Sequence, residues 1–444
     1  MLTLSCITNA YAQKPIRFPE GFRWCAATAA HQIEGGNTQS DWWDWEHAGK
    51  HIKNGDTSLQ ACDHWNRLEE DTQLLKDLGV TEYRFSVEWA KIEPADGQWN
   101  SDAIQHYRKE VELLLKAGIR PMVTLQHFTF PRWLSSKGGW EWTETPARFE
   151  RFTRLVYQQI APEAKEWVTI NEPFVDVLGG YYSGQFPPGE KRAMQEIVPV
   201  IRGMLRAHAL AYHALHDEAS KQGSTLRVGM AHHLRTFDAA HPWNVLHLLA
   251  AHWFDEAWNW ALPNALQTGE LKIHIPFTID VEESIAELAH TQDFFGLNYY
   301  TGDLISFSVF KGITIGHRAK ALKSDLGWDI YPKGLARLLS NIHSLYPDLS
   351  VFITENGIAD ASDEKRPKYL TDHLKVVAQA ISKGVQVEGY CIWSWLDNFE
   401  WDEGYSARFG LYEVDYATER RIPRKSAELF REIATKNQLP IKPY

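Results

Sequence analysis

The stretch Leu349-Ser350-Val351-Phe352-Ile353-Thr354-Glu355-Asn356-Gly357 joins an apolar, β-branched run to a carboxylate and a glycine. This order is typical of a buried parallel strand that presents a reactive side chain at its C-terminal end. A second such run, Trp167-Val168-Thr169-Ile170, ends at Asn171-Glu172-Pro173. Two carboxylates at strand ends of one barrel can face a single bond, so we expect Glu355 and Glu172 to form a pair.

The composition of the chain is that of an ordinary soluble globular protein. Its 444 residues are 44% hydrophobic and 23% charged. The formal net charge of -11 argues against nucleic acid or an anionic membrane as a partner, because both require a basic face. The 19 Trp are an unusual number. Their flat faces suit the C–H faces of sugars, although tryptophan also fills protein cores.

The four cysteines are Cys6, Cys25, Cys62 and Cys391, and none belongs to a C-x-x-C pair. Zinc ribbons and redox motifs are therefore not indicated. Four thiols in so long a chain do not make a disulfide scaffold, so we expect buried structural thiols. The histidines show no metal-binding spacing, and we expect His232, His233, His208 and His213 to be packing or surface residues.

Residues 1–12 need a separate interpretation. Leu2 to Ile7 is a short apolar run, and Ala10-Tyr11-Ala12 fits a cleavage site before Gln13, although the usual positive segment is missing. We interpret 1–12 as an export signal, with a retained N-terminal extension as the alternative. The protein would be periplasmic or secreted if this segment is cleaved, and cytoplasmic otherwise. No other apolar run approaches the ~20 residues that cross a bilayer.

Residues 13–444 are expected to form one domain, because no low-complexity tract, charge block or Gly/Ser linker divides them. Strand-like runs alternate with amphipathic helical stretches, which is the βα pattern of a parallel sheet. We expect strands at 22–27, 82–86, 120–125, 166–170, 226–231, 293–298, 350–354 and 388–393. We expect helices at 63–78, 102–117, 146–161, 194–222, 243–269, 332–345, 368–383 and 424–436. This count predicts a single (β/α)8 TIM barrel. A doubly wound sheet is the alternative, but no Gly-x-Gly-x-x-Gly follows the first strand.

Polar and aromatic side chains follow most of these strands, at the end where barrel enzymes place their active sites. They are Gln32, Arg84, His127, Asn171, Glu172, Asn298, Tyr300, Glu355, Trp393, Glu400 and Trp401. Arg84 would be costly inside a barrel mouth unless a carboxylate lies beside it. Together these residues predict a polar cup with an aromatic floor, as a sugar site requires. We therefore expect Glu172 and Glu355 to face a glycosidic bond.

Several motifs, in order along the chain, carry a family resemblance. They are Gln32-Ile33-Glu34-Gly35, Tyr83-Arg84-Phe85-Ser86, Thr169-Ile170-Asn171-Glu172-Pro173, Gly296-Leu297-Asn298-Tyr299-Tyr300-Thr301, Ile353-Thr354-Glu355-Asn356-Gly357, Trp393-Ser394-Trp395-Leu396-Asp397-Asn398-Phe399-Glu400-Trp401 and Arg408-Phe409-Gly410-Leu411. With this set the chain resembles glycoside hydrolase family 1, a family of retaining (β/α)8 β-glycosidases. The Asn-Glu-Pro triplet alone is a weak signal, because other barrel glycosidases share it.

The resemblance implies a role for each matching residue. It implies that Glu355 is the nucleophile and Glu172 the acid/base. Arg84 and Tyr300 would contact the nucleophile. The implied substrate-binding residues are Gln32, His127, Asn171, Asn298, Tyr300, Trp393, Glu400 and Trp401, with Trp393 as the stacking platform.

The expected function is that of a retaining, exo-acting β-glycosidase, and most specifically of a β-glucosidase. It would remove terminal β-D-glucosyl residues from short oligosaccharides or aryl and alkyl glucosides, through a covalent glycosyl-Glu355 intermediate. A β-galactosidase or β-fucosidase, a transglycosylating relative and a non-catalytic sugar-binding barrel are the alternatives. No metal or organic cofactor is expected, because two carboxylates supply the chemistry. The sequence favours no particular oligomeric state.

Overall fold

A closed parallel barrel forms the centre of the computed structural model, which describes residues 15–308 and 312–440. The expected export signal at 1–12 lies outside these residues. Neighbouring strands pair in the order β1, β2, β3, β4, β5, β8, β10, β11, and the β11–β1 pairing completes the ring. The barrel strands are β1 (Arg23–Ala27), β2 (Glu82–Ser86), β3 (Arg120–Gln126), β4 (Glu166–Asn171), β5 (Arg227–Ala239), β8 (Phe294–Ser308), β10 (Ser350–Asn356) and β11 (Val387–Ile392).

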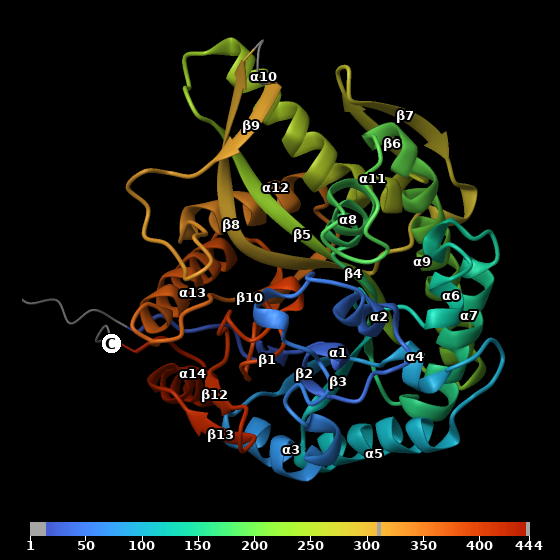
Figure 1. Cartoon of the computed structure of the whole chain (residues 1–444). Coiled ribbons are helices and arrows are strands. Elements are labelled where there is room, and N and C mark those ends of the chain that lie inside the picture. The colour runs from blue at the N-terminus through green and yellow to red at the C-terminus, as the bar shows by residue number, and fades with distance from the viewer. Residues whose placement is uncertain (1–14, 309–311, 441–444) are drawn as a thin grey trace, which may run out of the picture.

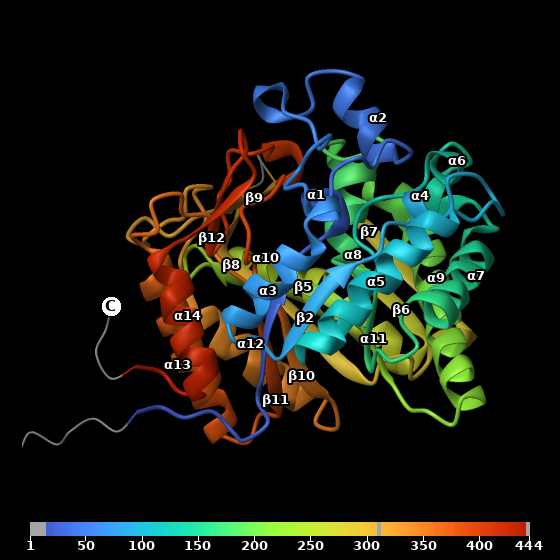
Figure 2. The same ribbon diagram turned by 90° about the horizontal axis from the view of Figure 1, so that it is seen from below.

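Helices surround the strands, as Figure 1 and, from below, Figure 2 show. They are α1 (Ala30–Ile33), α2 (Asp41–His47), α3 (Leu68–Asp77), α4 (Trp89–Ile92), α5 (Ser101–Ala117), α6 (Arg132–Ser135), α7 (Thr145–Leu155), α8 (Pro173–Val177), α9 (Val198–Lys221), α10 (Val245–Asp255), α11 (Ala261–Thr268), α12 (Pro332–Leu345), α13 (Arg366–Ser382) and α14 (Lys425–Lys436). The predicted (β/α)8 barrel is confirmed. None of the described helices has the length and apolarity needed to cross a membrane.

The sequence signals that define the helices are visible in α5. The Asn100 side chain accepts hydrogen bonds from the first backbone N–H groups of the helix, and Gly118 ends it with φ 80°. The buried residues Ile104, Tyr107, Val111 and Leu114 recur at intervals of three and four, so one face packs on the barrel. Capping, periodicity and a glycine stop therefore place this helix within one residue of its expected start.

Every residue of β10 is buried, as its apolar sequence predicts. The strand ends at Glu355 and Asn356, and Gly357 follows at a point of close backbone contact. A Cβ at Gly357 would lie 1.7 Å from the Trp393 carbonyl oxygen, so only glycine fits there. This contact sets the end of β10 directly against the end of β11, where Trp393 lies.

Two barrel strands are longer than expected. Past the barrel rim, β5 and β8 continue together to the pairing of Ala239 with Ile305, and β9 (Gly312–Gly316) adds an antiparallel strand to β8. The expected ends of these strands, 231 and 298, are therefore too early, because the two extensions pair with each other above the barrel. Figure 1 shows β9 and α10 at the top left and a hairpin of β6 (Glu270–Ile275) and β7 (Ile279–Ser284) at the top right. A second hairpin, β12 (Tyr412–Asp415) and β13 (Arg420–Pro423), precedes α14.

Two of the cysteines form a disulfide, which corrects the expectation of buried thiols. Cys25 in β1 and Cys391 in β11 are register partners in adjacent parallel strands, with Cα atoms 4.1 Å apart, and their sulfurs are bonded. Barrel closure brings together residues that are 366 positions apart in the chain, so their pairing has no local signal. Cys62 is a buried free thiol, as expected, and Cys6 lies outside the described residues.

The N-terminal ends of the barrel strands meet in a cluster of ion pairs, here called the basal ion cluster. Its members are Arg23, Arg120, Arg227, Glu82, Glu166 and Glu388. Arg23 donates to Glu166 at 2.5 Å and to Glu388 at 2.6 Å. Arg227 contacts the same two glutamates, at 3.1 Å and 2.7 Å. Three cations and three carboxylates therefore alternate across this end of the barrel.

Candidate active site

The two glutamates singled out from the sequence line one cavity of about 540 Å³ at the C-terminal ends of the strands. Glu172 directly follows β4, and Glu355 lies near the end of β10. Glu172 adopts a left-handed backbone conformation, with φ 43°, as do two other lining residues, Phe128 (φ 69°) and Trp401 (φ 51°). Such strain at a non-glycine residue costs on the order of 1–3 kcal/mol and is concentrated at functional sites. Three strained residues around one cavity mark it as the functional site.

Glu355 is held by two donors. Arg84 Nη1 donates to Glu355 Oε1 at 2.5 Å, and the Tyr300 hydroxyl donates to Oε2 at 2.6 Å. Burial raises the pKa of the Glu355 carboxyl, while the Arg84 charge and the Tyr300 hydrogen bond act to lower it. Both donors stabilise the ionised form, which is the form that can act as a nucleophile.

Glu172 has a different environment. Asn298 Nδ2 donates to Glu172 Oε1 at 2.9 Å, and within the described residues no Lys or Arg forms an ion pair with this carboxyl. Burial, followed by the charge of Glu355, raises the pKa of Glu172. Of the two carboxyls, Glu172 is therefore the one whose raised pKa is opposed by no directly contacting cation among the described residues.

Asn171 is oriented by its neighbours. Arg84 Nη2 donates to Asn171 Oδ1 at 2.6 Å, and Asn298 Nδ2 donates to the same oxygen at 3.1 Å. The Asn171 amide nitrogen then donates to His127 Nε2 at 2.9 Å. His127 must accept at Nε2, so its proton resides on Nδ1, a buried atom with no hydrogen-bond partner among the described residues. Burial lowers the pKa of His127 well below its usual value, so the ring is neutral.

Gln32 and Glu400 form the opposite side of the cup. Gln32 Nε2 donates to Asn398 Oδ1 at 3.0 Å and to Glu400 Oε2 at 3.1 Å. Its carbonyl oxygen, Oε1, is buried and has no partner within the described part of the chain. The rings of Trp393 and Trp401 lie 5.7 and 5.9 Å from that of His127. This part of the site therefore combines the ring faces of Trp393 and Trp401 with a buried polar atom, Gln32 Oε1, that is free to accept a hydrogen bond.

The structure brings all the expected site residues together, in two layers. The cavity is lined by His127, Asn171, Glu172, Tyr300, Glu355, Trp393, Glu400 and Trp401. Arg84, Asn298 and Gln32 adjoin this lining and hold members of it by the hydrogen bonds described above.

The sequence reasoning missed three residues beside Glu172. His233 lines the cavity, and its Nδ1 lies 3.8 Å from Glu172 Oε2, so the expectation that it is a packing or surface residue is wrong. Arg235 lines the cavity as well, and Trp258 Nε1 donates to the His233 backbone carbonyl at 2.8 Å. His233 and Arg235 alternate along β5 on one face, a period-two signal that lies beyond the expected strand end.

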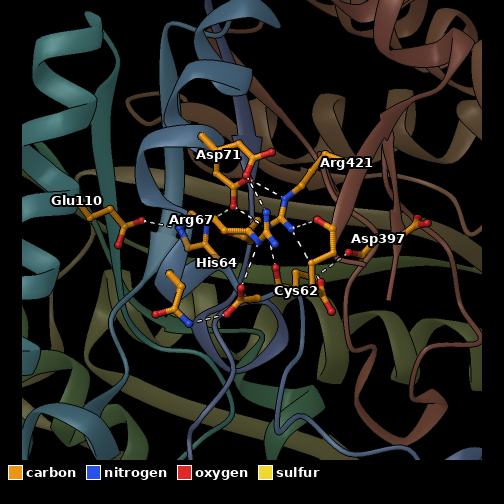
Figure 3. A network of polar contacts seen from close by, with 12 residues as sticks. Cys62, His64, Arg67, Asp71, Glu110, Asp397 and Arg421 are labelled. Carbon is orange, nitrogen blue, oxygen red and sulfur yellow. Dashed lines mark hydrogen bonds and ion pairs between the residues drawn. The ribbon is translucent and has the colours of Figure 1, made fainter. Parts of the chain in front are cut away.

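A buried charge network lies behind the cup (Figure 3). His64 Nδ1 contacts Asp71 Oδ2 at 2.7 Å, and His64 Nε2 contacts Glu110 at 3.3 Å. Burial alone would lower the pKa of His64, but hydrogen bonds to these two carboxylates raise it to about 10. Arg421 donates to both oxygens of Asp71 at 2.8 Å. The His64 imidazole therefore joins α3 to α5, and Arg421 joins α3 to β13.

The same network reaches the loop that carries Glu400 and Trp401. Arg421 donates to the Cys62 carbonyl at 2.7 Å, and the Cys62 thiol donates to the Asp397 carbonyl at 3.0 Å. The Asp397 carboxylate accepts from Arg424 at 2.8 Å. These contacts anchor the loop from the side away from the cavity, so they help to fix the positions of Glu400 and Trp401 in the cavity wall.

Comparison with known proteins places this site in a family. The model of glycosyl hydrolase family 1 matches residues 14–439. β-Glucosidase A of Thermotoga maritima is 34% identical, over 95% of this chain and 99% of the relative. A solved β-glycosidase from Pyrococcus horikoshii has a TM-score of 0.88 and 35% identity, covering 96% of this chain and 97% of the other.

The Thermotoga maritima β-glucosidase has also been solved in complex with castanospermine. That structure has a TM-score of 0.87 and 32% identity, covering 96% of this chain and 100% of the other. The paired glutamates, the barrel and these near-complete matches agree with one another. The chain therefore belongs to glycosyl hydrolase family 1 and is a glycoside hydrolase.

Proposed function

We propose that the protein is a retaining, exo-acting β-glucosidase that removes terminal β-D-glucosyl residues from short oligosaccharides or aryl and alkyl glucosides. The observation that carries the proposal is the unequal surroundings of the two carboxyls. Glu355 has a guanidinium and a hydroxyl in contact, whereas Glu172 has a single amide donor and the charge of Glu355 nearby. One carboxyl is thus suited to attack and the other to hold a proton.

In the first step, Glu172 donates its proton to the departing glycosidic oxygen while a Glu355 oxygen attacks the anomeric carbon. The glycosidic bond breaks, an ester bond to Glu355 forms, and the aglycone leaves as a neutral alcohol. Asn171, fixed by Arg84 and Asn298, is placed to hold the sugar's 2-hydroxyl, a contact that strengthens in the transition state.

In the second step, water hydrolyses the ester. Because Glu355 has lost its negative charge, the pKa of Glu172 falls, and its carboxylate takes a proton from the attacking water. The new C–O bond forms on the face that the aglycone left, and Glu355 departs as a carboxylate. A sugar hydroxyl in place of water would give transglycosylation by the same route.

We infer that two buried atoms without a hydrogen-bond partner among the described residues recognise the sugar. Gln32 Oε1 can accept from a hydroxyl, and His127 Nδ1 can donate to one. A buried polar atom without a partner costs about 1–3 kcal/mol, so a polyol ligand stabilises both. The Trp393 ring supplies a face for the sugar's C–H groups.

The names of the relatives support glucose as the sugar. Curated neighbours are called β-glucosidase and 1,4-β-D-glucan glucohydrolase, and the Thermotoga maritima enzyme has been solved with glucoimidazole. That same enzyme has been solved with galacto-hydroximolactam, which keeps β-galactosidase as the second candidate.

The test is a panel of p-nitrophenyl β-glycosides that differ only in the sugar, followed by cello-, laminari- and gentio-oligosaccharides. We expect the highest kcat/KM on the glucoside and release of single glucose units from chain ends. Preference for the galactoside or fucoside would replace glucose in the proposal. No turnover of any β-glycoside would instead support a silent sugar-binding barrel.

We also propose that the chain is exported. A disulfide between barrel strands is favoured in an oxidising compartment, and residues 1–12 have the pattern of a cleaved signal. N-terminal sequencing of the natively expressed protein should give Gln13 as the first residue. An intact Met1 would contradict export through this segment.

A further inference from the structure

A second cavity, of about 560 Å³, adjoins the catalytic one, and we propose that it binds the alkyl chain of an amphiphilic β-glycoside. It lies between elements that rise above the barrel: the tip of the β6–β7 hairpin, strand β9, the C-terminal part of α10 and the π-helical turn at 178–183. Figure 1 shows β9 with α10 and the β6–β7 hairpin on either side of the upper rim. This inference rests on the proposed glycosidase activity and specifies its substrate class.

The lining of this second cavity, here called the apolar cavity, determines what it can hold. Among the described residues it consists of aliphatic and aromatic side chains, with Tyr182 and Thr278 as the polar exceptions and no charged residue. The catalytic cavity, in contrast, is lined by Glu172, Glu355, Glu400, Asp402 and Glu403, among others. A further sugar unit in the apolar cavity would leave most of its hydroxyls without partners, at a cost of about 1–3 kcal/mol each. An alkyl chain has no such groups to satisfy and gains from burial.

The two cavities adjoin each other at four residues that line both, namely Leu178, Tyr182, Trp258 and Ile315. Of these four residues, Trp258 is connected to Glu172 through His233. Its indole N–H donates to the His233 carbonyl, and the His233 ring lies beside Glu172. The indole also packs near Phe174 and Phe237, at 6.2 and 6.3 Å between ring centroids.

Because the apolar cavity adjoins the catalytic cavity on the side of Glu172, the role of Glu172 determines which part of the substrate faces it. Glu172 protonates the oxygen of the departing aglycone, so the aglycone lies on the Glu172 side of the sugar. His233 and Trp258 line the catalytic cavity on this side, and Trp258 also lines the apolar cavity, so we infer that the aglycone passes these two residues. The aglycone that fits is therefore a flexible chain that leaves the polar cup and continues along apolar walls.

The volume and openness to solvent agree with ligand binding rather than with a packing void. A cavity of about 560 Å³ lies within the range of small-molecule sites, roughly 300–1,000 Å³. Its rim includes Phe277, Ile315 and Tyr182, which are exposed large side chains. A chain that covers them removes apolar surface from water as well as filling the space.

The test is a series of ethyl, butyl, hexyl and octyl β-glucosides, or the same alkyl series on the sugar that the aryl panel prefers, below micelle-forming concentrations. Each fully buried methylene can raise affinity up to about fourfold. We expect kcat/KM to rise at least tenfold from ethyl to octyl. A series that is flat in chain length, with normal aryl-glycoside turnover, would overturn the inference and leave the proposed function intact.

Two variants test the location. Met194→Gln and Ile313→Gln alter the apolar cavity at residues from different elements that do not line the catalytic one. We expect each to reduce the octyl-to-ethyl ratio at least threefold, with p-nitrophenyl glycoside turnover within twofold of wild type. Leu322→Gln, at an exposed leucine outside both cavities, is the matched control and should leave the ratio unchanged. Equal losses in the control and the cavity variants would contradict the assignment.

Binding of non-hydrolysable thioglycosides separates the inference from catalysis. By calorimetry, octyl β-thioglucoside should bind wild-type protein at least tenfold tighter than ethyl β-thioglucoside. Equal affinities would overturn the inference even if both variants failed to fold. Absence of aryl-glycoside turnover together with chain-length-dependent binding would reject the proposed hydrolase activity but retain the apolar cavity as a binding site.

Discussion

Both ends of the barrel contain arginines and glutamates, but the two ends differ in the ratio of cations to carboxyls. At the N-terminal end, three arginines alternate with three glutamates in the basal ion cluster. At the C-terminal end, the three glutamates predicted for the site have one directly contacting guanidinium among the described residues, that of Arg84. Those three carboxyls are Glu172, Glu355 and Glu400. The N-terminal end therefore has one arginine for each glutamate, whereas at the C-terminal end the carboxyls outnumber the contacting arginine.

The pKa values follow this balance. Burial acts to raise the pKa of Glu388 in the basal ion cluster, but its hydrogen bond to Arg227 and the nearby charges bring it below the usual value. Burial and the charge of Glu355 raise the pKa values of Glu172 and Glu400. Glu82 is the basal exception, because neither of its oxygens accepts a hydrogen bond within the described residues, and its pKa is about 7. The pKa of Glu388, which accepts a hydrogen bond from Arg227, is thus lowered, whereas Glu172, Glu400 and Glu82 accept none from an arginine in the described part of the chain and their pKa values are raised.

The largest effect is expected for Glu355→Gln. The amide cannot attack the anomeric carbon, so kcat on an aryl β-glucoside should fall by at least about 10⁴-fold, as when other enzymes lose a covalent nucleophile. Steady-state kinetics measures the loss, and an unchanged melting temperature would show that the fold survives. Turnover close to that of wild type would refute the assignment of Glu355.

Glu172→Ala should reduce the rate of hydrolysis by an amount that depends on the leaving group of the substrate. General acid catalysis contributes about 10²–10⁴-fold, so hydrolysis of a disaccharide should fall by that factor. A dinitrophenyl glucoside, whose leaving group needs little protonation, should lose much less activity in its first step. An equal loss on both substrates would contradict the role of Glu172 as the acid.

Glu166→Gln is the matched change at the opposite end of the barrel. It removes a carboxylate that contacts both Arg23 and Arg227, leaving the buried Arg23 and the half-buried Arg227 each without one of their partners. Breaking such a buried pair costs about 3–5 kcal/mol, which denaturant unfolding would measure. Because the basal ion cluster lies away from the chemistry, kcat/KM should stay within about threefold of wild type. A large loss of activity with normal stability would break the comparison between the two ends.

The smallest effect concerns the pH dependence of stability. Folding raises the pKa of Glu400 above its unfolded value, so the folded state is increasingly disfavoured as pH rises above about 4.5. Glu400→Gln removes this titration, and its melting temperature should exceed that of wild type at pH 7. The difference should vanish near pH 4, where wild-type Glu400 is protonated in both states. A difference in melting temperature that stays constant from pH 4 to pH 8 would contradict this account of Glu400.

The sequence predicted the parts of the site that local patterns define. Glu355 and Glu172 follow short apolar runs and precede a glycine or a proline, so both strand and carboxylate are visible in a few residues. Strand alternation with capped helices gave the barrel. His233 was missed because β5 continues eight residues beyond its expected end, from 231 to 239, and its paired extension depends on β8.

Features that arise only from barrel closure had no sequence signal. The Cys25–Cys391 disulfide joins the first and last strands, and the basal ion cluster collects single charged residues from the starts of several strands. The apolar cavity likewise combines hairpin, strand and helix residues that are far apart in the chain. Each of these depends on which strands become neighbours, and that follows from the tertiary structure.

The most direct test of the account is covalent trapping with a 2-deoxy-2-fluoro-β-glucoside that carries a dinitrophenyl leaving group. Such a substrate slows release from the nucleophile, so the intermediate should accumulate. Peptide mass spectrometry of the inactivated protein should find one fluoroglucosyl group on Glu355, with none on Glu172. A label on Glu172, or inactivation without a covalent adduct while product forms with inverted configuration, would contradict the proposed division of roles.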